Sequence, residues 1–362
     1  MPAVTRRRAP SGHTAPPKPG SPDELFEVLE SAGVERCVAV SHREAGLRAF
    51  IVLDDTSLGP AAGGVRTMRY ESTADALRDA VRLARAMTIK CALAGVAAGG
   101  GKAVVMDRPG LRRRDAFRVL GEHIDELGGL FRTAGDLGTT PRDLAAMAET
   151  TTYVHTNEAD LAVAVARGVL RCIEACVAVH RRAGGFDGLR VAVQGCGSIG
   201  VALAKALCAV DADVIVADTD AERAHRVAEA VGARVCPPDR VLLAEVDVVA
   251  PCAVGDVITP EIAQQLRAWA VCGAANNALA STEVADVLLA RAILHVPDPI
   301  ASAGAVIDGI GATVMGLADR TPLIDALGDT ALRVLEDSLR TGRAPAVLAE
   351  ELAWRRIRAA AD

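Results

Sequence analysis

Two lysines and one aspartate stand where chemistry is expected. Lys90 ends the run Met87-Thr88-Ile89-Lys90, Lys102 follows the three glycines Gly99–Gly101, and Asp136 lies in a second glycine-containing segment. Because glycine has no Cβ, the backbone can approach a ligand closely, and a lysine directly after it is aimed rather than merely exposed. Two lysines close together in a partly dry cleft disfavour each other's charge, which lets one serve as a base. We therefore expect a site that holds an anion and moves a proton.

A helix is expected to carry Lys90. Ser72 and Asp75 have the spacing of a capping box, which marks the start of the helix. Apolar residues then recur on one helical face, at Leu77, Ala80, Val81, Ala84 and Met87. Lys90 at the C-terminal end could simply complement the helix dipole. Its pairing with Lys102 in a glycine-rich loop favours a functional role.

Strands and helices alternate around the other two residues. The expected elements are strands within 36–53 that turn at Gly46, strands at 103–106 and 130–133, and a helix at 114–127. Thr140 is the expected N-cap of the next helix, with Pro141 in its first turn. Asp136 then lies between a strand and a helix, where α/β domains often carry ligand-binding groups.

A dinucleotide-binding turn is expected at residues 195–200. A strand at 189–194 and a helix at 201–210 flank the motif, whose proposed cofactor-binding residues are Gly195, Gly197, Ser198, Ile199 and Gly200. A lone G-x-G-x-x-G is weak, but the order of strand, turn and helix is the one that the motif requires. The next strand, 214–217, ends at Asp218, where a carboxylate accepts hydrogen bonds from ribose hydroxyls and repels a 2′-phosphate. NAD is therefore expected in preference to NADP, unless Asp218 only forms the turn before Thr219-Asp220.

Further strands near 246–250, 268–272 and 293–296 are followed by polar or small residues. Doubly wound sheets bind ligands at the carboxyl ends of their strands. Ala253 and the pair Asn276 and Asn277 are thus expected near the cofactor, with the asparagines at the nicotinamide ribose. A single asparagine in a loop more often forms a turn.

Composition restricts the class of protein. The chain has 362 residues and a net charge of −6, which argues against nucleic-acid binding. Its apolar runs fall short of the roughly 18 to 20 residues that span a bilayer, so no membrane is expected. Nine cysteines without a C-x-x-C pair suggest buried, reduced thiols in a cytoplasmic protein, and no metal site is expected.

The expected organisation has three parts. Residues 1–20 contain five prolines and Arg6-Arg7-Arg8, which predicts a disordered tail; a transit peptide or a nucleic-acid-binding arm is the alternative. Residues 21–150 form a substrate-binding, catalytic domain, joined by a C-terminal helix at about 335–362. Residues 151–334 form a Rossmann-type domain with a doubly wound parallel sheet.

These motifs also have a familiar order. Gly59-Pro60-Ala61-Ala62-Gly63-Gly64-Val65-Arg66, the Lys90 and Gly99–Lys102 segments and Gly138-Thr139-Thr140 follow one another as in the Glu/Leu/Phe/Val dehydrogenases. The chain resembles the leucine, valine and phenylalanine dehydrogenase branch from about Ser21 to near its C-terminus. The resemblance implies two α/β domains with the active site in the interdomain cleft, a homo-oligomer, and NAD-dependent, reversible oxidative deamination of an L-amino acid to a 2-oxo acid and ammonia.

The resemblance also implies roles. Removal of hydride from an amino acid gives an iminium, which water attacks to form a carbinolamine that releases ammonia. Lys90 would anchor the substrate carboxylate, Lys102 would be the base, and Asp136 would handle the amine and imine. The backbone of Gly63 and Gly64 would pack beside the substrate.

Departures from the family pattern bear on the substrate. Ala134-Gly135 precedes Asp136 where relatives have Ala-Glu, segment 155–161 is short, and Val165 and Ser302 replace a threonine and an asparagine near the nicotinamide and substrate. Ala62 stands where leucine is common and, with Ala134, suggests a larger side-chain pocket. An L-amino acid with an apolar or bulky side chain, or a non-proteinogenic one, is expected, with Ile324 and Leu327 as opposing walls.

Two other functions fit the sequence less well. One is an NAD-dependent enzyme for another imine, keto acid or hydroxy acid in a specialised pathway. The other is a non-catalytic NAD-binding paralogue. Retention of Lys90, Lys102 and Asp136 together favours an amino acid dehydrogenase over a mere sensor.

Overall fold

The computed structural model describes residues 24–34, 36–157, 161–181 and 185–361. The expected disordered tail, 1–20, lies outside them, as do residues 158–160 of the shortened segment. The chain divides into two compact units, Met1–Thr88 with Ala98–Thr156 and Ile89–Ala97 with Asn157–Asp362. The C-terminal helices are grouped with the second unit, whereas the sequence led us to expect 335–362 with the first domain.

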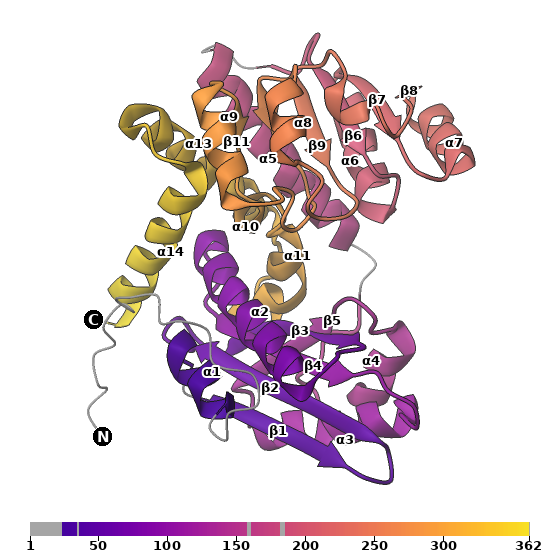
Figure 1. Cartoon of the computed structure of the whole chain (residues 1–362), viewed down its shortest axis with the longest axis vertical. Helices are drawn as coiled ribbons and strands as arrows, with labels where there is room; N and C mark the ends of the chain where they lie inside the picture. The colour runs from indigo at the N-terminus through magenta and orange to yellow at the C-terminus, as the bar shows by residue number, and fades with distance from the viewer. Residues whose placement is uncertain (1–23, 35, 158–160, 182–184, 362) are drawn as a thin grey trace. The chain divides into compact units, whose positions relative to one another are not determined.

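The first unit contains a mixed five-stranded sheet in the order β1-β2-β4-β3-β5. β1 (Arg36–His42) and β2 (Leu47–Asp55) form the long antiparallel hairpin in Figure 1, with Gly46 at a positive φ in its turn. β4 (Gly99–Met106) is antiparallel to β2. β3 (Ala61–Met68) runs parallel to both β4 and β5 (Phe131–Gly135).

Helices cover both faces of this sheet. α1 (Glu24–Ala32) and α2 (Thr73–Ala94) share one apolar cluster with Phe50, Val52 and Val104. α3 (Arg113–Glu126) and α4 (Pro141–Ala148) share another with Ile51, Val65 and further strand residues. The alternation follows from the two-residue repeat of a strand, which sends neighbouring side chains to opposite faces.

The predicted starts of α2 and α4 are confirmed, whereas the helix expected at 201–210 begins at Ser198. Ser72 directly precedes α2, which begins at Thr73, and its Oγ accepts the Asp75 backbone N–H over 3.1 Å. Thr140 caps α4 in a reciprocal capping box with Asp143, and Pro141 occupies the first turn. Lys90 lies near the C-terminal end of α2, as predicted.

The prediction of a glycine-rich loop before Lys102 is wrong, because Gly99–Lys102 is the first half of β4. A Cβ on Gly100 would overlap the Thr88 backbone nitrogen and the Ala84 carbonyl oxygen, both in α2. The glycines therefore let α2 pack directly on the strand. Lys102 projects from a sheet rather than from a flexible segment.

The second unit contains a six-stranded sheet in the order β11-β10-β9-β6-β7-β8, parallel throughout its described pairs. This is the doubly wound order, whose ligand crevice opens where the winding reverses, between β6 and β9. The strands are β6 (Arg190–Gln194), β7 (Asp213–Ala217), β8 (Arg234–Val235), β9 (Val248–Pro251), β10 (Ala270–Val271) and β11 (Leu294–His295). The expected α/β class and Rossmann-type sheet are confirmed.

Helices alternate with these strands (Figure 1). They are α5 (Leu161–Arg181), α6 (Ser198–Cys208), α7 (Ala221–Val231), η1 (Val241–Leu243), α8 (Pro260–Gln265), α9 (Thr282–Ala290), α10 (Asp298–Ala301), α11 (Gly304–Val306), η2 (Ile307–Gly311), α12 (Ala312–Met315), α13 (Thr321–Thr341) and α14 (Pro345–Ala361). Residues of α8 and α9 pack with Val249 and Val271 in one cluster. Within the described ranges, no helix combines the length and apolar character needed to cross a membrane.

Candidate functional site

A buried ion pair joins the two proposed catalytic residues of the first unit. Lys102 Nζ lies 2.7 Å from Asp136 Oδ2, and the Lys102 side chain is only 7% exposed. Lys102 stands in the middle of β4, and Asp136 directly follows β5. The sheet thus brings together the predicted base and carboxylate, which are 34 residues apart in the chain, and Lys102 is held on rigid backbone.

Arg66 is a third member of this cluster that we did not assign from the sequence. Its Nε donates to Asp136 Oδ2 over 3.0 Å, so that one carboxylate oxygen receives both Arg66 and Lys102. Arg66 also lies 3.4 Å from Asp79, whose carboxylate accepts the Tyr70 hydroxyl over 2.7 Å. The available signal was the position of Arg66 two residues after Gly64, on one face of β3.

Burial and charge act in opposite directions on the pair. Burial lowers the pKa of Lys102 because it disfavours the ammonium, and the net shift is downward although the Asp136 carboxylate opposes it. For Asp136, burial alone would raise the pKa, but Lys102 and Arg66 outweigh burial and lower it. Asp136 is thus an anion, and Lys102 gives up its proton more readily than a solvated lysine.

The glycines of β3 have a packing reason. A Cβ on Gly63 would overlap the Gly101 carbonyl oxygen, and one on Gly64 would lie 2.5 Å from the Gly135 carbonyl oxygen and 3.0 Å from Asp136 Cβ. Neighbouring strands therefore require glycine at both positions. Because of this packing, the backbone of Gly64 carries no side chain where it lies beside Asp136.

Ala62 and Ala134 lie on neighbouring strands of the same sheet. Ala62 is opposite Gly100 in the parallel register, and Gly100 and Lys102 share a face of β4 because they are two residues apart. Ala62 is fully buried, whereas Ala134, opposite Gly64, is half-buried. The register thus puts Ala62 on the face that carries Lys102.

Lys90, Asn276 and Ser302 form a polar cluster in the second unit. Lys90 Nζ donates to Ser302 Oγ over 2.9 Å and to Asn276 Oδ1 over 3.1 Å. Ser302 is buried and donates to the Asp298 carbonyl oxygen over 2.7 Å. Lys90, which we predicted to bind the substrate, is therefore hydrogen-bonded to Asn276, which we predicted to bind the cofactor. It is also hydrogen-bonded to Ser302, one of the departures from the family pattern.

Asp298, which follows β11, contacts this cluster through its backbone and the neighbouring loop through its side chain. Its Oδ2 accepts the Ala278 backbone N–H over 3.0 Å, which fixes the loop that contains Asn276 and Asn277. Burial raises the pKa of Asp298 to about 6, although the Lys90 charge and backbone hydrogen bonds oppose the shift. Asn277 has a φ of 52°, so the turn-forming role of an asparagine applies at this position.

The three motif glycines have separate structural reasons. Gly195 has a φ of 100°, and a Cβ there would lie 2.7 Å from the Cβ of Ala253. A Cβ on Gly200 would overlap the Gly195 carbonyl oxygen, so Gly200 lets α6 pack against the turn. A Cβ on Gly197 would meet no atom within 4 Å. Only a bound group would require glycine there, as expected where a pyrophosphate approaches the backbone.

The other residues assigned to this turn lie at the start of α6. Ser198 is its first residue and is exposed, and Ile199 follows it half-buried. Gln194, at the end of β6, has a buried side-chain oxygen with no hydrogen-bond partner among the described residues. The turn therefore has the glycines, the helix N-terminus and an unused acceptor that fit a dinucleotide.

Asp218 lies at the end of β7, as predicted. Its Oδ2 accepts the Cys196 N–H over 2.8 Å, and its Oδ1 accepts the Asp220 N–H over 2.9 Å. Burial would raise the pKa of Asp218, but these backbone donors and Arg223 lower it, so the carboxylate is ionised. Arg223, which we had not singled out, lies 3.6 Å from Asp218 and 3.3 Å from Asp220.

The residues suggested as further pocket walls are core residues of the second unit. Leu327 is buried in α13, and its carbonyl oxygen accepts Cys172 Sγ of α5 at 3.8 Å. A Cβ on Gly168 of α5 would lie 2.9 Å from Leu327 Cδ1. Ile324 and Val165 are also buried. Leu327 thus belongs to the packing between α5 and α13.

Comparison with known proteins gives a consistent result. Residues 35–153 match the family model described as Glu/Leu/Phe/Val dehydrogenase, dimerisation domain, and residues 216–309 match that described as Glutamate/Leucine/Phenylalanine/Valine dehydrogenase. The chain is 36% identical to a leucine dehydrogenase of Bacillus cereus over 343 residues, which cover 92% of this chain and 93% of that enzyme.

Solved structures agree with the sequence matches. The crystal structure of L-tryptophan dehydrogenase from Nostoc punctiforme matches with a TM-score of 0.84 and 32% identity, over 92% of this chain and 99% of that one. A hetero-hexameric glutamate dehydrogenase from Thermus thermophilus has a TM-score of 0.71 at 24% identity, over 93% and 94% of the two chains. The latter similarity establishes the fold alone.

Proposed function

Since the chain belongs to the Glu/Leu/Phe/Val dehydrogenase family, we propose that it is an amino acid dehydrogenase that uses NAD to deaminate an L-amino acid oxidatively and reversibly. The observation that carries the proposal is the buried pair of Lys102 and Asp136. A purely structural lysine would not be expected 7% exposed on a strand with a lowered pKa.

The proposed mechanism assigns Lys102 to the water molecule. When bound, NAD accepts the hydride from the substrate α-carbon. Neutral Lys102 then removes a proton from the water that attacks the iminium carbon, so the C–O bond forms and Lys102 Nζ holds the proton. Burial favours this neutral form, and the nearby Asp136 carboxylate stabilises the ammonium that results.

Asp136 and Arg66 have complementary proposed roles. Asp136 exchanges a proton with the substrate nitrogen, first accepting one from the ammonium and later returning one to the departing amine. Arg66 is a positioning residue, because it holds the same carboxylate oxygen that pairs with Lys102. Collapse of the carbinolamine breaks the C–N bond and releases ammonia, while the hydroxyl loses its proton to solvent, which leaves the 2-oxo acid.

Lys90 is proposed to bind the substrate carboxylate. Two of its partners, Ser302 Oγ and Asn276 Oδ1, are neutral oxygens. A carboxylate forms a stronger, charge-assisted hydrogen bond with an ammonium than a neutral oxygen does. We therefore expect a substrate carboxylate to displace these two oxygens from the ammonium.

NAD is the proposed cofactor because Asp218 is ionised where the adenosine ribose would bind. Arg223 is the opposing observation, since an arginine beside this position can accommodate a 2′-phosphate. Its guanidinium is already shared by Asp218 and Asp220. The two carboxylates leave the local charge negative, which favours NAD.

The proposed substrate has a bulky apolar side chain. Ala62 lies on the face of the sheet that carries Lys102. It is smaller than the leucine that the family resemblance leads us to expect at this position. The similar proteins include enzymes named for leucine and for L-tryptophan. We further propose a homo-oligomer, from the match to a dimerisation domain, and a cytoplasmic location, from nine free cysteines.

A spectrophotometric screen tests the function. The full chain would be assayed for NADH formation from NAD with valine, leucine, phenylalanine and tryptophan, and for NADH consumption with the matching 2-oxo acids and ammonia. We expect turnover in both directions. The 2-hydroxy acids are the control class: activity on them, or on 2-oxo acids without ammonia, would replace deamination with a simple keto-acid reduction. No turnover with any of these compounds, despite NAD binding, would contradict an enzymatic role.

A further inference from the structure

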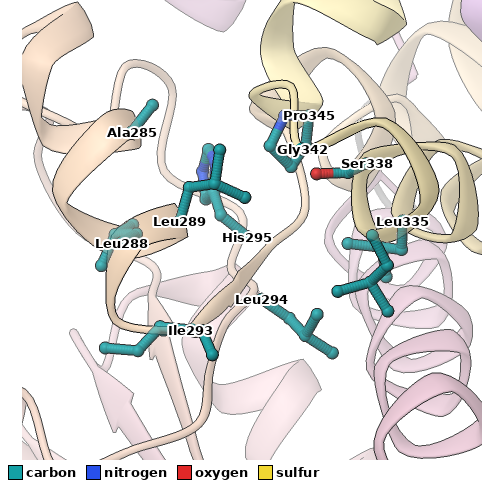
Figure 2. A pocket seen from close by; sticks show the side chains of 12 residues that line it. Ala285, Leu288, Leu289, Ile293, Leu294, His295, Leu335, Ser338, Gly342 and Pro345 are labelled. Atoms are coloured by element: carbon teal, nitrogen blue, oxygen red, sulfur yellow. The ribbon is translucent and has the colours of Figure 1, made fainter.

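The second unit contains a cavity that is lined by none of the residues assigned above. Its volume is about 270 Å³, and its lining comes from α9, β11 and α13 with the turn into α14. Figure 2 shows Ala285, Leu288 and Leu289 on one side and Leu335 and Ser338 on the other. None of its lining residues is a lysine, arginine, aspartate or glutamate.

His295 is the unusual member of this lining. It is only 5% exposed, and neither ring nitrogen has a hydrogen-bond partner among the residues that the structure describes. Figure 2 shows it beside Leu289, between the two walls. Burying such a polar group without a partner costs free energy, so a buried histidine in an apolar wall needs a reason.

Ser338 provides a second polar position. Its hydroxyl donates to the Arg343 carbonyl oxygen over 2.6 Å, so its proton is used and its oxygen remains an acceptor. Neutral histidine offers one N–H donor and one nitrogen acceptor. The cavity therefore presents a mostly hydrocarbon surface with a small number of hydrogen-bonding atoms, which is typical of small-molecule sites.

We propose that this cavity is a second ligand site, for an uncharged and mainly apolar molecule that carries one hydroxyl or N–H group bound by His295. A charged ligand is disfavoured because no charged side chain lines the cavity. The volume of the cavity also supports a ring-containing ligand. An apolar cavity of about 150 Å³ is enough to bind benzene, and this cavity is larger.

The test compares two probes of nearly equal shape. Phenol and toluene differ by a hydroxyl in place of a methyl group, and their dissociation constants for the full chain would be measured by ligand-observed NMR in sealed tubes. We expect saturable binding of phenol. In His295→Leu, the preference for phenol over toluene should fall at least about fivefold, which corresponds to about 1 kcal/mol and to one net hydrogen bond.

A second variant keeps the test independent of His295. Leu289→Trp fills the cavity from α9 and should abolish binding of both probes, whereas Val235→Trp, on the opposite edge strand β8, should leave binding unchanged. Failure of phenol to bind saturably would overturn the proposal. So would a phenol-to-toluene preference that His295→Leu does not change, or binding that survives Leu289→Trp.

Discussion

Single side chains in the first unit are strongly dependent on one another. Lys102 and Arg66 both contact one carboxylate oxygen of Asp136, so the loss of one of the three charges changes the electrostatic energy of the other two. Removing one member of a buried ion pair leaves an uncompensated charge, which costs several kcal/mol. Variants that keep the shape of the side chain are therefore the more informative ones.

Lys102→Ala should abolish turnover while NAD binding survives, because the base is lost and the Gly195–Gly200 turn is unchanged. We expect kcat to fall by at least about 100-fold, the usual contribution of general acid–base catalysis. Steady-state kinetics and a calorimetric NAD titration measure the two effects. The exposed Lys205, replaced by alanine, is the control. A rate within about tenfold of the wild type, a barrier change of only ~1.4 kcal/mol, would remove Lys102 from its role.

Asp136→Asn should shift the pH dependence of catalysis. Turnover needs neutral Lys102, so kcat/KM rises with pH as Lys102 loses its proton. Asp136 opposes the downward shift of the Lys102 pKa, and asparagine removes that charge at almost constant shape. The rising limb should therefore move to lower pH, although the maximal rate falls. Full pH profiles of both proteins provide the measurement, and a limb that moves to higher pH would contradict the assignment.

At the scale of elements, the glycine segment shows what sequence patterns convey and what they miss. The sequence predicted that Gly99–Lys102 belongs to a functional site, but it could not show that α2 packs on these glycines. Three glycines give no apolar alternation, so the usual sign of a strand is absent. The reason for them is a tertiary contact with Ala84 and Thr88.

Gly100→Ala tests this packing. The added methyl group would overlap backbone atoms of α2, which cannot move as freely as a side chain. We expect the free energy of unfolding to fall by about 1 to 3 kcal/mol, as for other overpacked sites. Urea unfolding followed by circular dichroism measures it. Gly197→Ala, where a Cβ meets no atom within 4 Å, is the control for stability. Equal effects at both positions would show that crowding is not the cause.

The loop between β7 and α7 determines the cofactor preference that we expect. NAD should be preferred over NADP, and Asp218→Ala should narrow the difference because Arg223 then faces the 2′ position with only Asp220 to balance it. The ratio of kcat/KM values for the two cofactors is the measurement. Arg223→Ala is the informative second variant and should leave the preference for NAD intact. Equal values for both cofactors in the wild type would contradict the prediction.

At the scale of the whole molecule, most of the fold could be predicted and part of the site could not. The strand–turn–helix order at 189–210 predicted the Rossmann-type sheet, because hydrophobic periodicity and turn residues are local signals. The link from Tyr70 through Asp79 and Arg66 to Asp136 spans 70 residues of sequence, from position 66 to position 136. No local pattern contains such a link, and only the folded sheet brings its members together.

His295 gives the second unit a predictable acid sensitivity. Burial lowers the pKa of His295 to about 4, whereas an unfolded chain has a histidine pKa near 6.5. Between these values the unfolded state binds more protons, so stability falls as pH decreases from about 6.5 to about 4. The difference of about 2.5 pH units corresponds to about 3 kcal/mol, and below pH 4 the loss is complete.

His295→Leu should remove that part of the acid loss. It also removes a buried polar group without a partner, so the variant should be more stable than the wild type even at pH 7. Urea unfolding at pH 7, 5.5 and 4.5 measures both effects, with exposed His225→Leu as the control. The difference in stability between His295→Leu and the wild type should grow as the pH falls.

A difference that stays constant with pH would mean that His295 does not titrate as its burial requires. A variant that is less stable at every pH would mean that the ring makes favourable contacts that outweigh its unpaired nitrogens. The expected result, a less stable wild type, is what a residue kept for ligand binding rather than for folding would show.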